Sequence, residues 1–347
     1  MPDRLIDLSS DTATKPSREM RAFMAEAEVG DEQRREDPTV NLLQEMVAEL
    51  FGMEAALFLP SGTMCNAIAI KVHTRMGDEM ILHRDAHPYT SEGGGPAALA
   101  GVSSRLLEGE RGMFTAEQVR AAISPDNPHS ARSRLVSIEN TTNGGTGKVW
   151  PLETIRAIAA VAHEHGLKTH MDGARLMNAV VASGIPASEF VAEMDTAWVD
   201  LSKGLGCPVG GVLAGTREDM ELARRYKHLY GGAMRQAGII AAAGVYALRH
   251  NVERMADDHA NAKLLAAGLA EIPGIQINLD DIETNIVHFD VSETGRTGGE
   301  VNAAITSRGA RMGGGNGPRM RAVTHLDVSH ADIERTVEIM RDAVVNA

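Results

Sequence analysis

The chain has 347 residues, of which 43% are hydrophobic and 23% charged, and its formal net charge is −13. This composition is typical of a globular protein long enough for two domains, and the negative charge argues against a nucleic-acid or anionic-membrane surface. Two cysteines are too few for a disulfide framework, so we expect reduced thiols. Neither a signal-peptide pattern nor an apolar run of membrane-spanning length occurs, so we expect a cytoplasmic protein.

The first hundred residues predict an alternation of helices and strands. The predicted elements are helices over 17–27, 40–51 and 64–73 and strands over 55–59 and 79–82. Thr39 is the expected cap of the second helix. Ser61, Gly62 and Thr63 lie between a strand and a helix start, where backbone N–H groups and the helix dipole can bind phosphate. This signal is weak by itself, and the segment is not a Walker loop.

His87 follows the strand predicted over 79–82 and precedes a glycine-rich loop over 93–95. An imidazole at this place could stack on a flat cofactor or act as a base. For an isolated histidine, a loop residue without a ligand is the commoner interpretation. The remaining histidines lack the spacing of metal ligands, so no metal site is predicted.

Two later segments share one pattern: a short strand, a charged residue near its end, then a turn. The first ends at Asp172, and the second, predicted over 196–199, leads to Lys203, 31 positions after Asp172. That distance fits one strand–helix–strand unit, so both residues should lie at the edge where open α/β sheets bind ligands. A buried carboxylate beside a lysine that can form a Schiff base is what pyridoxal phosphate requires.

The rest of the chain predicts further alternation and a smaller second domain. The predicted elements are strands over 134–138, 209–215, 275–278 and 286–290 and helices over 152–165, 174–183 and 237–272. The long helix over 237–272 should connect a large domain, residues 1–250, to a C-terminal α+β domain, residues 251–347. Arg321, at the start of a predicted strand, is either a surface charge or a clamp for a carboxylate.

Together these segments resemble the aromatic amino acid β-eliminating lyase/threonine aldolase family, and in particular its low-specificity L-threonine aldolases, nearly from end to end. The resemblance is carried by residues 7–12, 36–41, 60–63, 87, 172–175, 201–206, 232–236 and 323–328. It implies a three-layer α/β large domain of the pyridoxal-phosphate-dependent transferase type, with a mostly parallel sheet, and a smaller α+β C-terminal domain. It also implies cleavage of threonine, allo-threonine or a related β-hydroxy-α-amino acid to glycine and an aldehyde.

The resemblance further assigns roles to particular residues. Lys203 would bind pyridoxal phosphate as a Schiff base, Asp172 would pair with its ring nitrogen, and His87 would stack on the ring and transfer protons. The phosphate would be held by Ser61, Gly62, Thr63 and Arg235. The substrate carboxylate would be oriented by Ser10, Arg175 and Arg321, with Arg175 also near the cofactor. A homo-oligomer, a dimer of dimers with sites at the subunit interfaces, is implied as well.

Three positions depart from the family pattern. Arg34 stands where the family commonly has a tyrosine, Thr142 where it has a histidine associated with the β-hydroxyl, and His228 where it has a lysine beside the phosphate. Arg34 either favours an acidic β-substituent, as in hydroxyaspartate, or is a solvated charge.

Three other functions remain as alternatives. A pyridoxal-phosphate-dependent β-elimination would use the same site. A nucleotide-binding Rossmann enzyme is disfavoured because no Gly-x-Gly-x-x-Gly follows the first strand. A non-enzymatic relative is disfavoured because Lys203 and Asp172 are both present.

Overall fold

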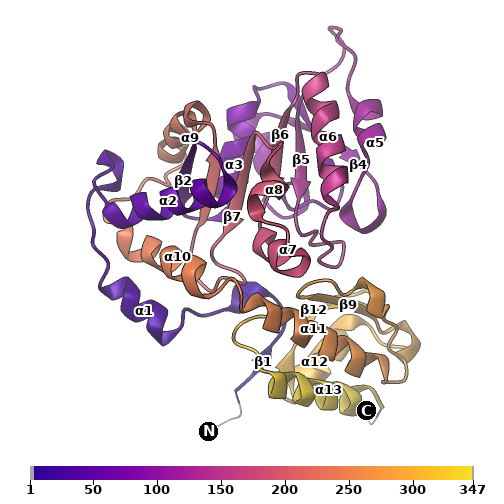
Figure 1. Ribbon diagram of the computed structural model, residues 1–347. Helices are drawn as coiled ribbons and strands as arrows, with labels where there is room; N and C mark the ends of the chain where they lie inside the picture. Colours follow the sequence, from indigo (N-terminus) through magenta and orange to yellow (C-terminus); the bar gives the residue numbers. More distant parts are fainter. Residues whose placement is uncertain (1–3, 346–347) are drawn as a thin grey trace.

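A seven-stranded sheet organises the fold (Figure 1). In spatial order its strands are β2 (Ala55–Leu59), β8 (Gly211–Gly215), β7 (Thr196–Asp200), β6 (Lys168–Asp172), β5 (Arg132–Glu139), β3 (Asp78–His83) and β4 (Ser103–Leu107). Strand β8 runs antiparallel to β2 and β7, and the other neighbouring pairs are parallel. The computed structural model describes residues 4–345. The predicted α/β fold with a mostly parallel sheet is confirmed.

Helices cover both faces of this sheet, which explains why β7 and β8 are buried along their whole length. One face carries α3 (Gly62–His73) and α9 (Arg217–Leu229). The other carries α2 (Pro38–Phe51), α5 (Ala116–Ala122), α6 (Leu152–Glu164), α7 (Leu176–Ser183) and α8 (Ala187–Val191). Outside α2 lie α10 (Gly238–His250) and then α1 (Arg18–Ala25), and the short α4 (His87–Thr90) follows β3.

The C-terminal part has its own small sheets and its own apolar cluster. Its elements are α11 (Met255–Ala270), β9 (Ile286–Asp290), α12 (Gly298–Thr306), β10 (Ala310–Arg311), β11 (Gly313–Gly314), β12 (Arg319–Val323) and α13 (His330–Val345). Strands β11, β12 and β9 are antiparallel, and β1 (Ile6–Asp7) pairs with β10. The N-terminal residues Ile6 and Leu8 are therefore buried in this second cluster. The division of the chain into domains at residue 250 stays a prediction.

Short single-turn helices complete the described chain. They are Asp11–Ala13, Glu32–Arg34, Pro96–Ala100, Glu110–Gly112, Leu279–Asp281 and Ser292–Thr294.

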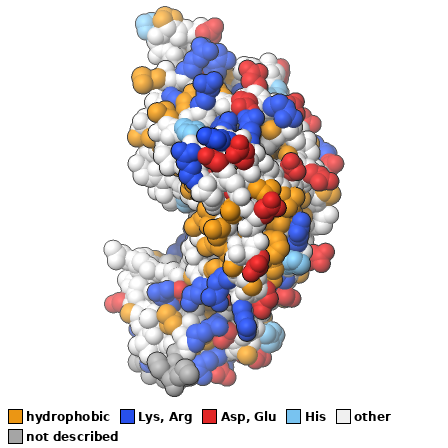
Figure 2. Space-filling model, turned by 90° about the vertical axis from the view of Figure 1, so that its left-hand side faces the viewer, with side chains coloured by type: hydrophobic (Ala, Val, Ile, Leu, Met, Phe, Trp, Pro, Cys, Tyr) orange, Lys and Arg blue, Asp and Glu red, His pale blue; other side chains and the backbone are white. Residues whose placement is uncertain are grey.

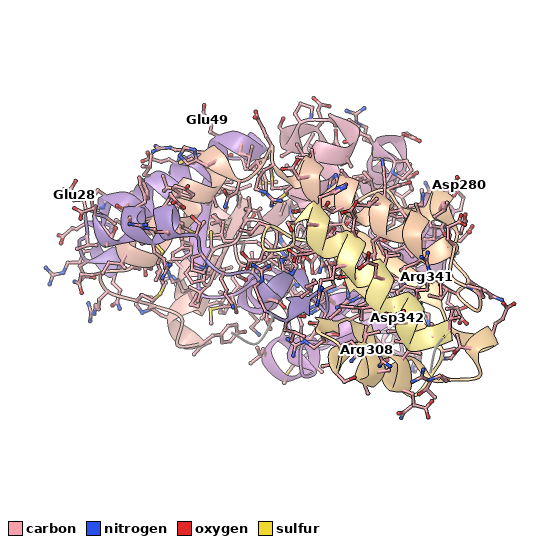
Figure 3. All side chains as sticks on the ribbon, turned by 90° about the horizontal axis from the view of Figure 1, so that it is seen from below. Glu28, Glu49, Asp280, Arg308, Arg341 and Asp342 are labelled. Carbon is pink, nitrogen blue, oxygen red and sulfur yellow. The ribbon has the colours of Figure 1, made fainter. Side chains whose placement is uncertain are left out.

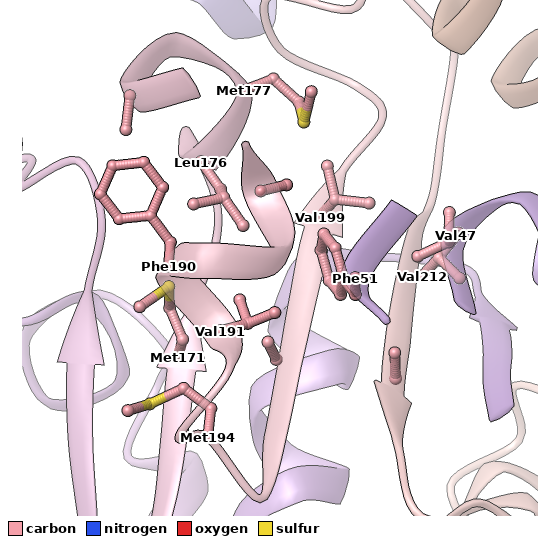
Figure 4. Packing of buried hydrophobic residues seen from close by; sticks show 14 of the residues in the cluster. Val47, Phe51, Met171, Leu176, Met177, Phe190, Val191, Met194, Val199 and Val212 are labelled. Carbon is pink, nitrogen blue, oxygen red and sulfur yellow. The ribbon is translucent and has the colours of Figure 1, made fainter. Parts of the chain in front are cut away.

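The large cluster of buried apolar side chains fixes how α2, α7 and α8 pack on the sheet. Figure 4 shows Phe51 of α2 beside Val199 of β7, and Leu176 of α7 beside Phe190 of α8. Each of these side chains is at most 2% exposed. Full burial of such a side chain contributes about 1.5–3 kcal/mol, so this cluster anchors the strands that end at the candidate site.

Helix α2 begins two residues earlier than predicted, and its cap is a different residue. The Asp37 carboxylate, not Thr39, accepts the N–H of Val40, and Pro38 occupies the first helical position. Thr39 instead donates its hydroxyl to the carbonyl of Glu28. Both residue types cap helices well, so the backbone path into the helix decides which of them does so.

The prediction of one long helix over 237–272 is wrong, because the chain turns between α10 and α11. The break falls at Asn251, whose side-chain amide donates to the carbonyl of Leu205 at 2.8 Å. The turn therefore ties the C-terminal helices to the loop that follows Lys203. Periodicity alone could not show it, since apolar residues continue at helical spacing on both sides.

Two strand predictions also fail. Only an isolated bridge between Gln276 and Asp290 forms where a strand was predicted over 275–278. The edge strand β4 was not predicted, because its first three residues, Ser103 to Arg105, are polar and only Leu107 is buried.

Charged side chains such as Glu28, Glu49 and Asp280 lie at the periphery of the molecule (Figure 3). Among the described residues, every helix is too short or too polar to cross a bilayer.

Candidate active site

Two adjacent strands bring Asp172 and Lys203 to one edge of the sheet. Strand β6 ends at Asp172, and β7, which ends at Asp200, pairs with it in parallel register. Lys203 lies in the turn directly after β7, and its side chain is 16% exposed. The prediction that these residues follow neighbouring parallel strands is confirmed, and they lie at the edge typical of ligand sites.

Asp172 is 1% exposed and is held by two hydrogen bonds. Its Oδ1 accepts the N–H of Ala174 at 3.0 Å, and its Oδ2 accepts Nδ2 of Asn66 at 2.8 Å. The amide oxygen of Asn66 accepts the indole N–H of Trp198 at 2.8 Å, which fixes the direction of the amide. A carboxylate held this way suits a cationic ring N–H, because it presents a fixed negative charge.

His87 is joined to the same network through Glu92. The His87 Nδ1 lies 2.8 Å from Glu92 Oε1, and that oxygen also accepts Asn66 Nδ2 at 2.7 Å. The hydrogen bond to Glu92 raises the pKa of His87, although burial opposes the shift. With Nδ1 engaged by the carboxylate, Nε2 is the nitrogen left for other partners.

Residues 139–142 place unpaired polar atoms beside this cluster. Among the described residues, buried side-chain atoms of Glu139, Asn140, Thr141 and Thr142 have no hydrogen-bond partner. Burial, followed by the charge of Asp172, raises the pKa of Glu139 to about 8. Buried polar atoms without partners are costly unless a ligand satisfies them, so this edge fits a site completed by a polar molecule such as pyridoxal phosphate.

The start of α3 fits the phosphate of that cofactor. The Ser61 hydroxyl caps the helix by accepting the N–H of Met64 at 3.2 Å, which leaves the N–H groups of Gly62 and Thr63 at the helix start. A Cβ on Gly62 would lie 2.2 Å from the Trp198 ring, so only glycine fits there. In the described chain, no contact brings Arg235 to the start of α3.

Arg235 and His228 lie outside these contacts. The Arg235 guanidinium bonds Asp31 at 2.9 Å and its side chain is 63% exposed, while His228 lies in the last turn of α9.

The residues predicted to bind a substrate carboxylate are partly brought together. Arg175 and Arg321 both donate to the side-chain oxygen of Asn143, at 3.3 and 3.1 Å. The other two donors of Arg175 bond the carboxylate of Asp11, each at 2.7 Å. The Ser10 hydroxyl instead accepts the N–H and the hydroxyl of Thr12. Arginine forks match carboxylates geometrically, so the Arg175–Arg321 pair is the candidate clamp.

The buried Asp11–Arg175 pair predicts a stability effect. Burial alone would raise the pKa of Asp11, but the charge and hydrogen bonds of Arg175 lower it to about 2. Its contribution to stability is therefore complete above the unfolded-state pKa of about 3.9 and is lost as the pH falls towards about 2.

We expect Asp11→Asn to leave the Arg175 charge buried and unpaired, lowering the free energy of unfolding at pH 7 by about 3–5 kcal/mol. Urea unfolding at pH 7 and at acidic pH measures this loss, which should shrink as the pH falls. A loss that is the same at both pH values would contradict the assignment.

Sequence reasoning missed Asn66, Glu92, Glu139 and Asn143. The only local signal for the last two is their place at the end of a predicted strand. Asn66 and Glu92 lie inside a helix and a loop, where nothing in the pattern distinguishes them.

Comparisons with known proteins show the family to which the chain belongs. The family model described as beta-eliminating lyase matches residues 7–292. The chain is 43% identical over 335 residues to the low specificity L-threonine aldolase of Escherichia coli K12, covering 95% of this chain and 96% of that protein. It is 37% identical over 347 residues to low-specificity L-threonine aldolase 1 of Arabidopsis thaliana, covering 99% and 97%.

Solved structures show the same fold. The threonine aldolase of Leishmania major matches with a TM-score of 0.82 at 20% identity, covering 98% of this chain and 99% of that one. Since the family model spans most of the sequence and these relatives align over almost its whole length, the chain belongs to the beta-eliminating lyase family.

Proposed function

We propose that this chain is a pyridoxal-phosphate-dependent aldehyde-lyase. It cleaves L-threonine, L-allo-threonine or a related β-hydroxy-α-amino acid to glycine and an aldehyde. The observation that carries this proposal is the position of Asp172 and Lys203 at the ends of adjacent parallel strands. The threonine aldolase names of full-length relatives from Escherichia coli and Arabidopsis thaliana support the substrate class.

Each residue proposed to bind pyridoxal phosphate has a role that follows from its chemistry. When bound, pyridoxal phosphate supplies an electron sink for the electron pair released when the Cα–Cβ bond breaks. Lys203 supplies the amine that holds the cofactor. Asp172 keeps a proton on the ring nitrogen through its fixed charge, and the start of α3 binds the phosphate with the N–H groups of Gly62 and Thr63.

Orientation of the substrate comes from the arginine clamp. Arg175 and Arg321, joined through Asn143, would hold the substrate carboxylate and so fix the orientation of the Cα–Cβ bond that breaks. Ser10 is proposed to join this clamp once substrate is bound. His87 exchanges a proton with the β-hydroxyl or the product, a role worth about 10²–10⁴-fold in rate.

A product assay tests the proposed reaction. Purified protein with pyridoxal phosphate should be yellow, borohydride should attach the cofactor to Lys203, and L-threonine should give glycine and acetaldehyde in equal amounts. The alternative, β-elimination, would give ammonia and a keto acid instead. Formation of ammonia without glycine would refute the aldolase assignment while leaving the cofactor assignment intact.

Arg34 is proposed to select the side chain of the substrate. Its loop is anchored by the buried ion pair of Glu32 with Lys227, while the Arg34 side chain is 73% exposed and lies 3.9 Å from Asp31. We expect Arg34→Ala to lower cleavage of 3-hydroxyaspartate relative to threonine by up to about fivefold, because an exposed ion pair contributes up to about 1 kcal/mol. Competition between the two substrates measures this ratio. An unchanged ratio would show that Arg34 is a solvated charge.

The chain is further proposed to form a homo-oligomer, a dimer of dimers with sites at the subunit interfaces. Figure 2 shows apolar side chains gathered on the face that carries α1 and α2. Phe23 of α1, Leu42 of α2 and Ile239 of α10 are 40%, 37% and 49% exposed. In such an assembly Arg235 would reach the phosphate of a neighbouring subunit. Light scattering of the purified protein measures the mass.

The remaining proposals concern location and domains. The chain is proposed to be cytoplasmic, which the buried, unpaired Cys65 and Cys207 support. Residues 1–250 and 251–347 are proposed as its large and small domains.

A further inference from the structure

Asp200, the last residue of β7, places a second buried carboxylate against Lys203. Its Oδ2 lies 2.7 Å from Lys203 Nζ, and its Oδ1 accepts the N–H and the hydroxyl of Ser202 at 2.7 and 2.9 Å. The Asp200 side chain is 4% exposed. The carboxylate is therefore held by its own turn, and one of its oxygens is directed at the lysine amine.

The same carboxylate lies at the start of α3. A Cβ built on Gly62 would be 3.2 Å from Asp200 Oδ2, so this oxygen adjoins the place proposed for the phosphate. A helix N-terminus attracts anions, but an ionised carboxylate beside it repels a second anion. Asp200 Oδ2 therefore lies close both to the Lys203 amine and to Gly62 at the start of α3.

The charges around Lys203 favour its ammonium form. Burial and the charge of Arg175 lower the pKa of Lys203, but the charges of Asp200 and Asp11, with the hydrogen bond to Asp200, raise it, and the net change is upward. Only the neutral amine is a nucleophile. Lys203 therefore has to give up a proton before its amine can react with an aldehyde.

We propose that Asp200 is the internal proton acceptor of Lys203 during cofactor binding, an inference that rests on the proposed function. The proton moves from Lys203 Nζ to Asp200 Oδ2, which leaves a neutral amine and a neutral carboxylic acid. The total charge of the pair is unchanged. One proton transfer thus makes the nucleophile and removes the negative charge that would repel the phosphate.

Difference infrared spectroscopy of the full-length protein, before and after addition of pyridoxal phosphate, tests this step. We expect cofactor binding to produce a carboxylic-acid C=O band that shifts in D₂O. The band should be absent in Asp200→Asn, which still takes up the cofactor as judged by its yellow colour. Asp200→Ser, whose hydroxyl can also accept the Ser202 N–H, serves as the second variant if Asp200→Asn does not fold.

Asp78→Asn is the matched control, because Asp78 is another buried carboxylate paired with a cation, Arg132, and lies at the start of β3, away from the sheet edge that carries Lys203. The band should persist in Asp78→Asn. Cofactor uptake without a new acid band, or a band that survives in Asp200→Asn, would overturn the role of Asp200 while leaving the enzyme assignment intact. A wild-type chain that takes up no cofactor would overturn the proposed function itself, and this inference with it.

Discussion

Replacing Lys203 by alanine is expected to lower threonine cleavage by at least about 10⁴-fold, the scale seen when the covalent group of an enzyme is removed. The reason is that Lys203 provides the amine at the sheet edge where Asp172 and the start of α3 converge. The variant should also lose borohydride attachment of the cofactor. Glycine formation under saturating threonine, followed by mass spectrometry of the reduced protein, measures both effects.

Lys71→Ala is the matched control, because Lys71 lies in the last turn of α3, away from the helix start that faces Lys203. It should keep wild-type activity and cofactor attachment. The exchange also removes the ion-pair partner of Asp200, so the folding of Lys203→Ala has to be checked. We expect its circular dichroism spectrum to match that of the wild type. Activity of Lys203→Ala within tenfold of wild type would place the chemistry on another amine.

Asp172→Asn is expected to reduce the turnover number by about 10³-fold, the scale of a lost electrostatic contact to the reacting system. Asparagine keeps the size of the side chain but has no charge to hold a proton on the ring nitrogen, so the electron sink becomes weaker. Cofactor binding should change less than turnover, because the phosphate and Lys203 contacts remain. Stopped-time glycine assays and absorbance titration with pyridoxal phosphate separate the two quantities.

Asp195→Asn provides the comparison for this exchange. Asp195 precedes β7 at its other end, where it binds Lys168 at 2.6 Å and the N–H of Thr169 at 2.8 Å. Its replacement should lower stability and leave turnover unchanged once the protein is folded. If Asp172→Asn kept more than a tenth of wild-type turnover, the carboxylate would not be the partner of the ring nitrogen.

The pieces of the candidate site that could be predicted carry local signals. Asp172 and Lys203 each follow a short buried strand and precede glycine, a pattern readable within ten residues. The start of α3 is marked by Ser61 and Gly62 directly after a strand. The parallel pairing of β6 and β7 then follows from the handedness and length of strand–helix–strand units.

The hydrogen-bond network around those groups could not be predicted. Asn66 and Asp172 are 106 positions apart, and Asp11 and Arg175 are 164 apart. No periodicity or turn pattern relates residues at such distances. The prediction of one helix over 237–272 failed for a similar reason, because Asn251 ends α10 and contacts Leu205, which is distant in the sequence.

The amino-acid sequence by itself determined the alternation of strands and helices, the mostly parallel sheet and the two groups that flank its candidate cofactor edge, because apolar spacing and turn residues act over a few positions. Only the tertiary structure decided that Asp11 occupies the fork of Arg175, that Glu92 engages His87 and that Asp200 lies against both Lys203 and Gly62. The physical reason is that side-chain orientation in a buried site is set by the partners that folding brings within hydrogen-bond distance, and these come from distant parts of the chain.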